Sequence, residues 1–155
     1  MKKMIDVHRD EIVAGQGEVV LESDASGACL VIVARDAIKK IGGLAHAMFY
    51  SSFAERRKSS VVLRNASEAI DEMIENMSLI GADRDNIEVS LITGENVLHE
   101  SNDTEYTRNL NFAADILRQK HVKFRENSVQ DVGGAHVALD VESGEILYKQ
   151  ESSPF

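Results

Sequence analysis

The sequence has a single cysteine, Cys29, and a single proline, Pro154, among its 155 residues. One cysteine excludes an intramolecular disulfide, so the chain lacks the cross-linked framework of small secreted proteins, and a reducing compartment is favoured. The lack of proline in the body of the chain excludes a proline-rich linker. No internal repeat is present either. We therefore expect one domain over residues 1–155, long enough to bury a hydrophobic core.

Positive charge is also scarce, because 17 lysines and arginines stand against 26 aspartates and glutamates and leave a net charge of −9. Such a chain repels phosphate backbones and anionic lipids unless a local basic patch reverses the field. The best candidate for such a patch is Arg56-Arg57-Lys58 with Arg64, which is short and has no interleaved aromatic residues. We therefore do not expect nucleic acid as a partner.

Long hydrophobic segments are absent as well. The uncharged run Ala25–Ala34 is too short to cross a bilayer. The basic start Met1-Lys2-Lys3 reaches another charge at Asp6 before the apolar core of a signal peptide can form. We expect a cytoplasmic protein that does not insert into membranes.

The apolar residues that are present follow a mixed α/β pattern. The continuous, β-branched run Ala28–Arg35 predicts a strand covered on both faces. Further strands are predicted at Glu18–Glu22, Ile41–Phe49, Ile87–Ile92, Val122–Arg125, Ala135–Val141 and Glu145–Lys149. Apolar stripes at helical spacing predict helices over Asn65–Ile80 and Thr104–Lys120. The order of these elements indicates a mixed-sheet α/β sandwich with two main helices and about seven strands.

Turn signals separate several of these elements. Gly15-Gln16-Gly17 is read as a turn before the first strand, Asp36–Lys40 as the connection between the second and third strands, and Ser143-Gly144 as the last hairpin turn. The polar stretch Ser51–Ser60 is expected to be a surface loop. The pair Gly42-Gly43 allows a bulge or a close backbone approach within its strand.

Cys29 is the first candidate for chemistry. A free cysteine on an apolar strand is usually an inert, well-packed small hydrophobe, because reactivity needs both a lowered pKa and some exposure. The functional alternative depends on the small residues before it, Ala25-Ser26-Gly27-Ala28. Small residues let a substrate carbonyl approach, and backbone N–H groups at such a turn can hold an oxyanion.

His46 is the second candidate. It lies near the far end of the strand that follows the one with Cys29. If these strands pair as a hairpin around Asp36–Lys40, their outer ends meet and bring Cys29 close to His46, as a thiol–imidazole pair requires. The alternative is a core histidine that bonds a backbone carbonyl.

The other polar groups are interpreted as structural. Three histidines have no paired spacing of the kind that zinc ligands show: His99, His121 and His136. The acidic run Glu68, Asp71, Glu72 and Glu75 predicts the solvated face of the first helix. Gly133-Gly134 is read as a turn before a strand, because a phosphate loop would need a helix after it.

The segment from Gly27-Ala28-Cys29 through Arg35-Asp36 to Gly42-Gly43-Leu44-Ala45-His46 resembles the CheD family of chemoreceptor glutamine deamidases. That family has a Gly-Ser-Cys element on a strand, then Arg-Asp, then a Gly-x-x-Ala-His element at similar spacing. The likeness continues at Asn65-Ala66-Ser67-Glu68-Ala69-Ile70, Arg108-Asn109 and Asp131-Val132-Gly133-Gly134, so it covers most of the chain.

The resemblance implies an α/β sandwich shared with deamidating bacterial toxins. It implies hydrolysis of glutamine side chains on the cytoplasmic helices of methyl-accepting chemotaxis receptors, and binding to the phosphatase CheC. By that resemblance Cys29 is the nucleophile and His46 its base. Ser23 holds the place of the family's hydroxyl residue, usually threonine, which can orient the imidazole. This chemistry needs no metal or organic cofactor.

The sequence departs from the family pattern at Ala28, where the family has serine, and at Thr93-Gly94-Glu95-Asn96, where small residues are usual. The basic stretch that the family has after Gly134 is shortened to Ala135-His136-Val137-Ala138-Leu139. These departures bear on substrate choice and receptor docking. Two alternatives therefore stand beside the deamidase: a CheD-like adaptor that binds CheC or receptors without turnover, and a cysteine hydrolase with another amide substrate.

Overall fold

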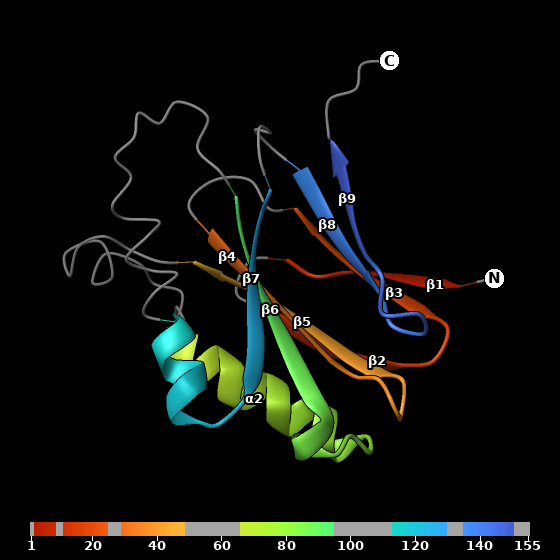
Figure 1. Ribbon diagram of the computed structural model, residues 1–155. Helices are drawn as coiled ribbons and strands as arrows, with labels where there is room; N and C mark the ends of the chain where they lie inside the picture. Colours follow the sequence, from red (N-terminus) through yellow and green to blue (C-terminus); the bar gives the residue numbers. More distant parts are fainter. Residues whose placement is uncertain are drawn as a thin grey trace, which may run out of the picture.

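The structure, a computed structural model, describes residues 2–8, 11–24, 29–48, 66–94, 113–129 and 135–150. In these ranges the chain forms a four-stranded sheet, a five-stranded sheet, helix α2 (Ala66–Leu79) and a second helix at 113–119. Both helices lie on the side of the five-stranded sheet that faces away from the four-stranded sheet (Figure 1). The expected mixed α/β sandwich with two main helices is confirmed.

The four-stranded sheet has the order β1-β3-β8-β9. Strand β1 (Lys3–Asp6) runs parallel to β3 (Val19–Asp24), whereas β8 (Ala135–Asp140) is antiparallel to both β3 and β9 (Ile146–Gln150). Gly144 lies between β8 and β9 with a φ of 85°, a left-handed conformation that glycine adopts without a Cβ penalty. The last predicted hairpin turn is therefore confirmed.

The five-stranded sheet has the order β2-β5-β4-β6-β7. It consists of β2 (Ile12–Gln16), β5 (Ile41–Met48), β4 (Cys29–Asp36), β6 (Ile87–Gly94) and β7 (Lys123–Val129). Strands β6 and β7 are parallel and the other pairs are antiparallel. The predicted hairpin around residues 36–40 is confirmed, and its register places Val31 opposite His46 and Cys29 opposite Met48.

Strand β4 divides the hydrophobic core into two parts. Ile32 and Ala34 pack on the side of the two helices, while Val31 and Val33 pack on the side of the four-stranded sheet. All four are at most 2% exposed. Because successive side chains of a strand point to opposite faces, a strand covered on both faces must be apolar throughout. This explains the continuous apolar run from which the strand was predicted.

Helix α2 has the amphipathic character that its sequence predicts. Its buried stripe consists of Ala69, Ile70, Met73, Ile74 and Met77, and Glu68, Asp71 and Glu75 are exposed. Gly81 follows the helix with a φ of 116°, as a helix-terminating glycine does. Neither this helix nor the one at 113–119, the two α-helices of the described residues, has the length and apolarity needed to span a membrane.

Two strands were missing from the sequence prediction, so the expected count of seven was too low. Strand β1 has exposed residues at Lys3, Met4 and Asp6, and only its Ile5 packs toward the core, so no apolar run marks it. Strand β2 includes two residues of the predicted glycine turn. Gly15 pairs with Gly42 inside the sheet, and only Gly17, with a φ of 77°, lies in the turn.

The remaining elements agree with the sequence prediction to within a few residues wherever the structure describes them. The second predicted helix, Thr104–Lys120, is described only from residue 113 to residue 119. The predicted surface loop Ser51–Ser60, the basic residues Arg56 to Arg64 and the turn at Gly133-Gly134 lie outside the described residues.

Gly42 and Gly43 allow close approach on the two faces of β5. A Cβ at position 42 would lie 2.8 Å from Leu139 Cδ2 of the four-stranded sheet, and a Cβ at position 43 would lie 2.9 Å from Met73 Cγ of α2. Overpacking of this kind typically costs about 1–3 kcal/mol. The glycine pair therefore sets the spacing of both layers that pack on the central hairpin.

Arg35 and Asp36, the last two residues of β4, form hydrogen bonds to three loops, at residues 38–39, 83 and 141–142. Asp36 is fully buried, and its carboxylate accepts hydrogen bonds from the backbone N–H groups of Ile38, Lys39 and Asp83 at 2.8–3.1 Å. Burial alone would raise the pKa of Asp36, but these N–H donors outweigh burial and hold the pKa below its usual value. These hydrogen bonds attach the end of β4 to the neighbouring loops.

We expect Asp36→Asn to lower the free energy of unfolding by about 2 kcal/mol at pH 7, because three N–H donors lose a charged acceptor. The folded-state pKa lies below the unfolded-state value. The carboxylate therefore stabilises the fold at pH values above the unfolded-state pKa, and this contribution is lost as the pH falls through the folded-state pKa. Urea denaturation between pH 7 and pH 3 should show a weaker pH dependence for the variant than for the wild type.

Asp115→Asn is the matched control, because Asp115 is an exposed carboxylate that pairs with Arg118 three residues away. Exposed pairs contribute about 0–1 kcal/mol, so this change should hardly affect stability. Identical pH dependence for Asp36→Asn and the wild type would contradict the assignment.

Candidate active site

A buried hydrogen bond between Ser23 and His46 joins the two sheets. Ser23 belongs to β3 and His46 to β5, and Ser23 Oγ lies 2.9 Å from His46 Nδ1. The two residues are only 3% and 4% exposed. The structure thus brings together two of the three residues that the sequence predicts for the site, in an environment where a hydrogen bond is electrostatically stronger than in water.

The contacts of Ser23 determine which imidazole nitrogen carries the proton. The single hydroxyl proton of Ser23 is donated to the backbone carbonyl of Val7, at an Oγ–O distance of 2.9 Å. A carbonyl can only accept, so Ser23 Oγ acts as the acceptor toward His46 and Nδ1 as the donor. In the neutral imidazole the lone pair therefore lies on Nε2, the nitrogen that can accept a proton.

Val7 is a site residue that the sequence did not reveal. It is 2% exposed, and its N–H donates to Glu22 O at 2.8 Å, which continues the pairing of β1 with β3. Its contribution is a backbone carbonyl, which every residue type has. The alternation Met4-Ile5-Asp6-Val7 could have indicated the strand, but no side chain could have indicated the contact with Ser23.

The backbone of Cys29 occupies the first position of β4, opposite Met48. Val31, two positions later, lies opposite His46. Because strand positions alternate between the two faces of a sheet, position 29 falls on the face of Val31 and His46. Diagonal positions of this kind on neighbouring antiparallel strands are about 7–8 Å apart. The hairpin therefore places Cys29 and His46 on one face, as near diagonal neighbours.

Several other residues singled out from the sequence lie outside the described residues. They include the turn Ala25–Ala28 before the cysteine, Glu95 and Asn96, and His99. His121 is exposed in the turn after the second helix. Among the described residues, no group of three or more histidine, cysteine, aspartate or glutamate side chains is arranged to hold a metal ion.

Comparison with known proteins gives consistent matches. Residues 49–150 match the family model described as CheD chemotactic sensory transduction. A probable chemoreceptor glutamine deamidase CheD of Chlorobium luteolum is 28% identical over 91% of this chain and 69% of that protein. One of Methanococcus maripaludis is 30% identical over 81% of this chain and 82% of that protein. The chemoreceptor glutamine deamidase CheD of Thermotoga maritima is 23% identical, over 97% of this chain and 92% of that protein.

A solved structure has a similar fold. It is the crystal structure of Neisseria meningitidis protein NMB0706, of the DUF152 family model, with a TM-score of 0.50 and 11% sequence identity. The match covers 81% of this chain and 62% of that chain. At this identity the likeness concerns the fold alone.

We expect Ser23→Ala to change the tautomer of His46, because Nδ1–H loses its acceptor. Nitrogen-15 NMR of histidine-labelled protein distinguishes protonated from unprotonated ring nitrogens, and His46→Gln identifies the signals of His46. The wild type should show a protonated Nδ1 and an unprotonated Nε2, whereas Ser23→Ala should show a mixture. The free energy of unfolding should also fall by about 1–3 kcal/mol, because buried polar atoms lose their partners.

Ser23→Thr is the matched control, because threonine keeps the hydroxyl group. It should retain the wild-type tautomer. A wild-type spectrum in which Nε2 carries the proton would contradict the hydrogen-bond assignment at Ser23.

Proposed function

The chain belongs to the CheD family, and on that basis we propose that it is a protein-glutamine deamidase. It converts glutamine side chains on the cytoplasmic helices of chemotaxis receptors to glutamate by cysteine–histidine catalysis. The single observation that supports this most directly is the hydrogen bond between Ser23 and His46, which leaves Nε2 as the proton acceptor of the imidazole. Position 29 of β4 and His46 of β5 lie on the same face of the sheet. Relatives from Chlorobium and Thermotoga carry the name chemoreceptor glutamine deamidase.

The first half of the proposed reaction forms a thioester. Nε2 of His46 accepts the thiol proton of Cys29, and the thiolate attacks the carbonyl carbon of the glutamine side chain. Backbone N–H groups next to Cys29 stabilise the oxyanion. The imidazolium then gives its proton to the amide nitrogen, the C–N bond breaks, and ammonia leaves.

The second half releases glutamate. Water attacks the thioester while Nε2 of His46 accepts its proton, and the C–S bond breaks. The proton returns to the thiolate of Cys29. In sum, one amide and one water become one carboxyl group and one ammonia, so the reaction needs no oxidant, reductant or cofactor.

Ser23 acts as a positioning residue in this mechanism. Its bond to Nδ1–H keeps Nε2 unprotonated before the reaction and supports the imidazolium when Nε2 gains a proton. The substrate glutamines lie on the cytoplasmic helices of the receptor, so the protein acts in the cytoplasm. The phosphatase CheC is the second proposed partner, by family likeness.

The deamidation assay tests the proposal directly. Purified protein is incubated with the cytoplasmic part of a chemoreceptor from the same organism, and mass spectrometry follows conversion of glutamine to glutamate. Cys29→Ala should abolish conversion. His46→Gln should reduce the rate by about 10²–10⁴-fold, the usual contribution of general acid–base catalysis.

His121→Gln is the matched histidine control, since His121 is exposed and far along the chain from the site. It should retain wild-type activity. Equal conversion by the wild type and Cys29→Ala would exclude Cys29 as the nucleophile. If the wild type converts nothing but binds receptor or CheC, the CheD-like adaptor function is the correct one.

A substrate-independent test uses the thiol itself. Cys29 is the single cysteine of the chain, so a thiol reagent reports on it alone. An ordinary cysteine is only a few per cent thiolate at pH 7, and proton transfer to His46 raises that fraction. We therefore expect His46→Gln to slow modification of the native protein at pH 7 by about tenfold. Equal rates would mean that His46 does not act on the thiol.

A further inference from the structure

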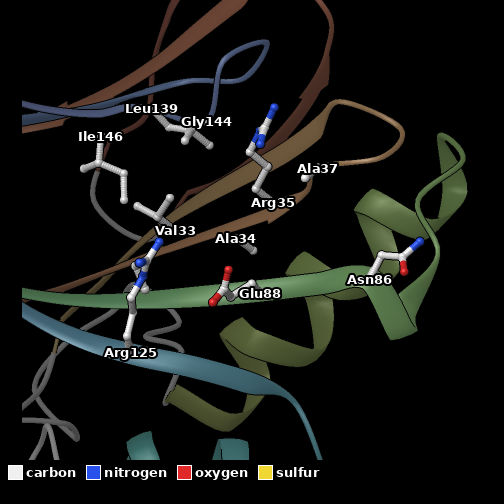
Figure 2. Close-up of a pocket in the computed structure, with 11 residues that line it drawn as sticks. Val33, Ala34, Arg35, Ala37, Asn86, Glu88, Arg125, Leu139, Gly144 and Ile146 are labelled. Carbon is white, nitrogen blue, oxygen red and sulfur yellow. The ribbon is translucent and has the colours of Figure 1, made fainter.

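A small pocket lies between the two sheets, near the end of β4 opposite to Cys29. Its floor and walls include Val33 and Arg35 of β4, Glu88 and Ser90 of β6, and Arg125 of β7. The side chains of Arg35, Glu88 and Arg125 rise from one face of the five-stranded sheet toward Leu139 and Ile146 of the other sheet (Figure 2). Arg35 lies six positions from Cys29 along β4, which corresponds to about 20 Å. This pocket is therefore separate from the candidate active site.

Arg35 is held in place by the turn between β8 and β9. Its Nε and Nη2 donate to the backbone carbonyls of Val141 and Glu142 at 2.9 and 2.6 Å. Gly144 lies against the guanidinium, and a Cβ there would be 2.5 Å from Nη1. The positive charge at this end of the pocket is thus fixed in position before any ligand binds.

Glu88, Ser90 and Arg125 line the same pocket as Arg35. Within the described residues, no side-chain hydrogen bond or ion pair involves Ser90, Glu88 or Arg125. Ser90 is 95% buried, since its exposed fraction is 5%, and it lines the pocket. Ser90 lies opposite Arg125 on the neighbouring strand, so a hydroxyl and a guanidinium stand side by side in the pocket, where both can donate to a ligand oxygen.

The size and charge of the pocket limit the ligand. Its volume is about 100 Å³, which is well below the roughly 300–1,000 Å³ of sites for drug-sized ligands. Two guanidinium groups and one carboxylate leave one positive charge in excess, in a protein whose net charge is −9. A small monoanion fits both limits.

We propose that this pocket binds a carboxylate group that carries a short aliphatic chain. Arg125 and Ser90 donate hydrogen bonds to the carboxylate oxygens, as guanidinium and hydroxyl groups do. The aliphatic part lies against Val33, Leu139 and Ile146. Glu88 selects against a second negative charge, because like charges repel at close range. The carboxylate can come from a free short-chain acid or from a glutamate side chain of a protein partner.

Titration with butyrate, followed by backbone NMR shifts, tests the pocket. Shifts should concentrate on the amides of β4, β6 and β7 that line it, with a dissociation constant on the order of 1 mM. Arg125→Gln should weaken binding by about tenfold or more, and Ser90→Ala by about threefold to tenfold. Arg118→Gln is the matched control, because Arg118 lies over the ring of Phe124, which packs on the helix side of the sheet. It should leave binding unchanged.

Two further arms identify the charge preference and the source of the carboxylate. Glutarate should bind more weakly than butyrate in the wild type, and Glu88→Gln should reduce that difference. If butyrate displaces a bound receptor fragment, the natural carboxylate belongs to the protein partner. If the fragment remains bound in the presence of butyrate, the natural ligand is a free short-chain acid.

No shifts at these amides, or equal shifts in the wild type, Arg125→Gln and Ser90→Ala, would overturn the proposal. The measurement needs no turnover, so its failure is distinguishable from a failure of the proposed deamidase function.

Discussion

The arrangement of the site depends on one buried chain of hydrogen bonds, from the Val7 carbonyl through Ser23 to His46. Each of the three residues comes from a different part of the sandwich. Buried polar atoms must find partners, and these find them only when β1, β3 and β5 keep their registers. A slip of one residue in a strand would turn its side chains to the opposite face. The packing of the sandwich and the protonation state of the imidazole are therefore set by the same contacts.

Strand β4 connects this site with the rest of the molecule. Its middle residues are apolar on both faces, and they anchor the helices on one side and the four-stranded sheet on the other. Its polar residues lie at its two ends: Cys29, the proposed nucleophile, is at one end, and Arg35 with Asp36 is at the other. Close packing along the whole strand restrains the residues at both of its ends, so a strand holds such residues in position more firmly than a loop does.

The features that could be predicted from the sequence are those that depend on local residue patterns. The run Ala28–Arg35 indicated a strand covered on both faces, and the turn at Asp36–Lys40 indicated the hairpin; together they placed His46 near Cys29. Other features depend on contacts between distant segments. Ser90 and Arg125 lie side by side only because β6 and β7 pair in parallel. The Val7 contact is made by a backbone carbonyl, so no side chain in the sequence indicates it. Strand β1 was not predicted because most of its residues are exposed and form no apolar run.

The serine at position 23, where the family resemblance implies threonine, illustrates how such contacts compensate for a missing methyl group. A threonine methyl group would restrict the side-chain rotamer. Here the hydroxyl of Ser23 is fixed by two hydrogen bonds of 2.9 Å at a buried position. Rotating the hydroxyl away would leave the Val7 carbonyl and His46 Nδ1 without this partner, at about 1–3 kcal/mol for each buried group. That cost is larger than thermal energy by several-fold, so serine holds the proposed base in one tautomer without the methyl group.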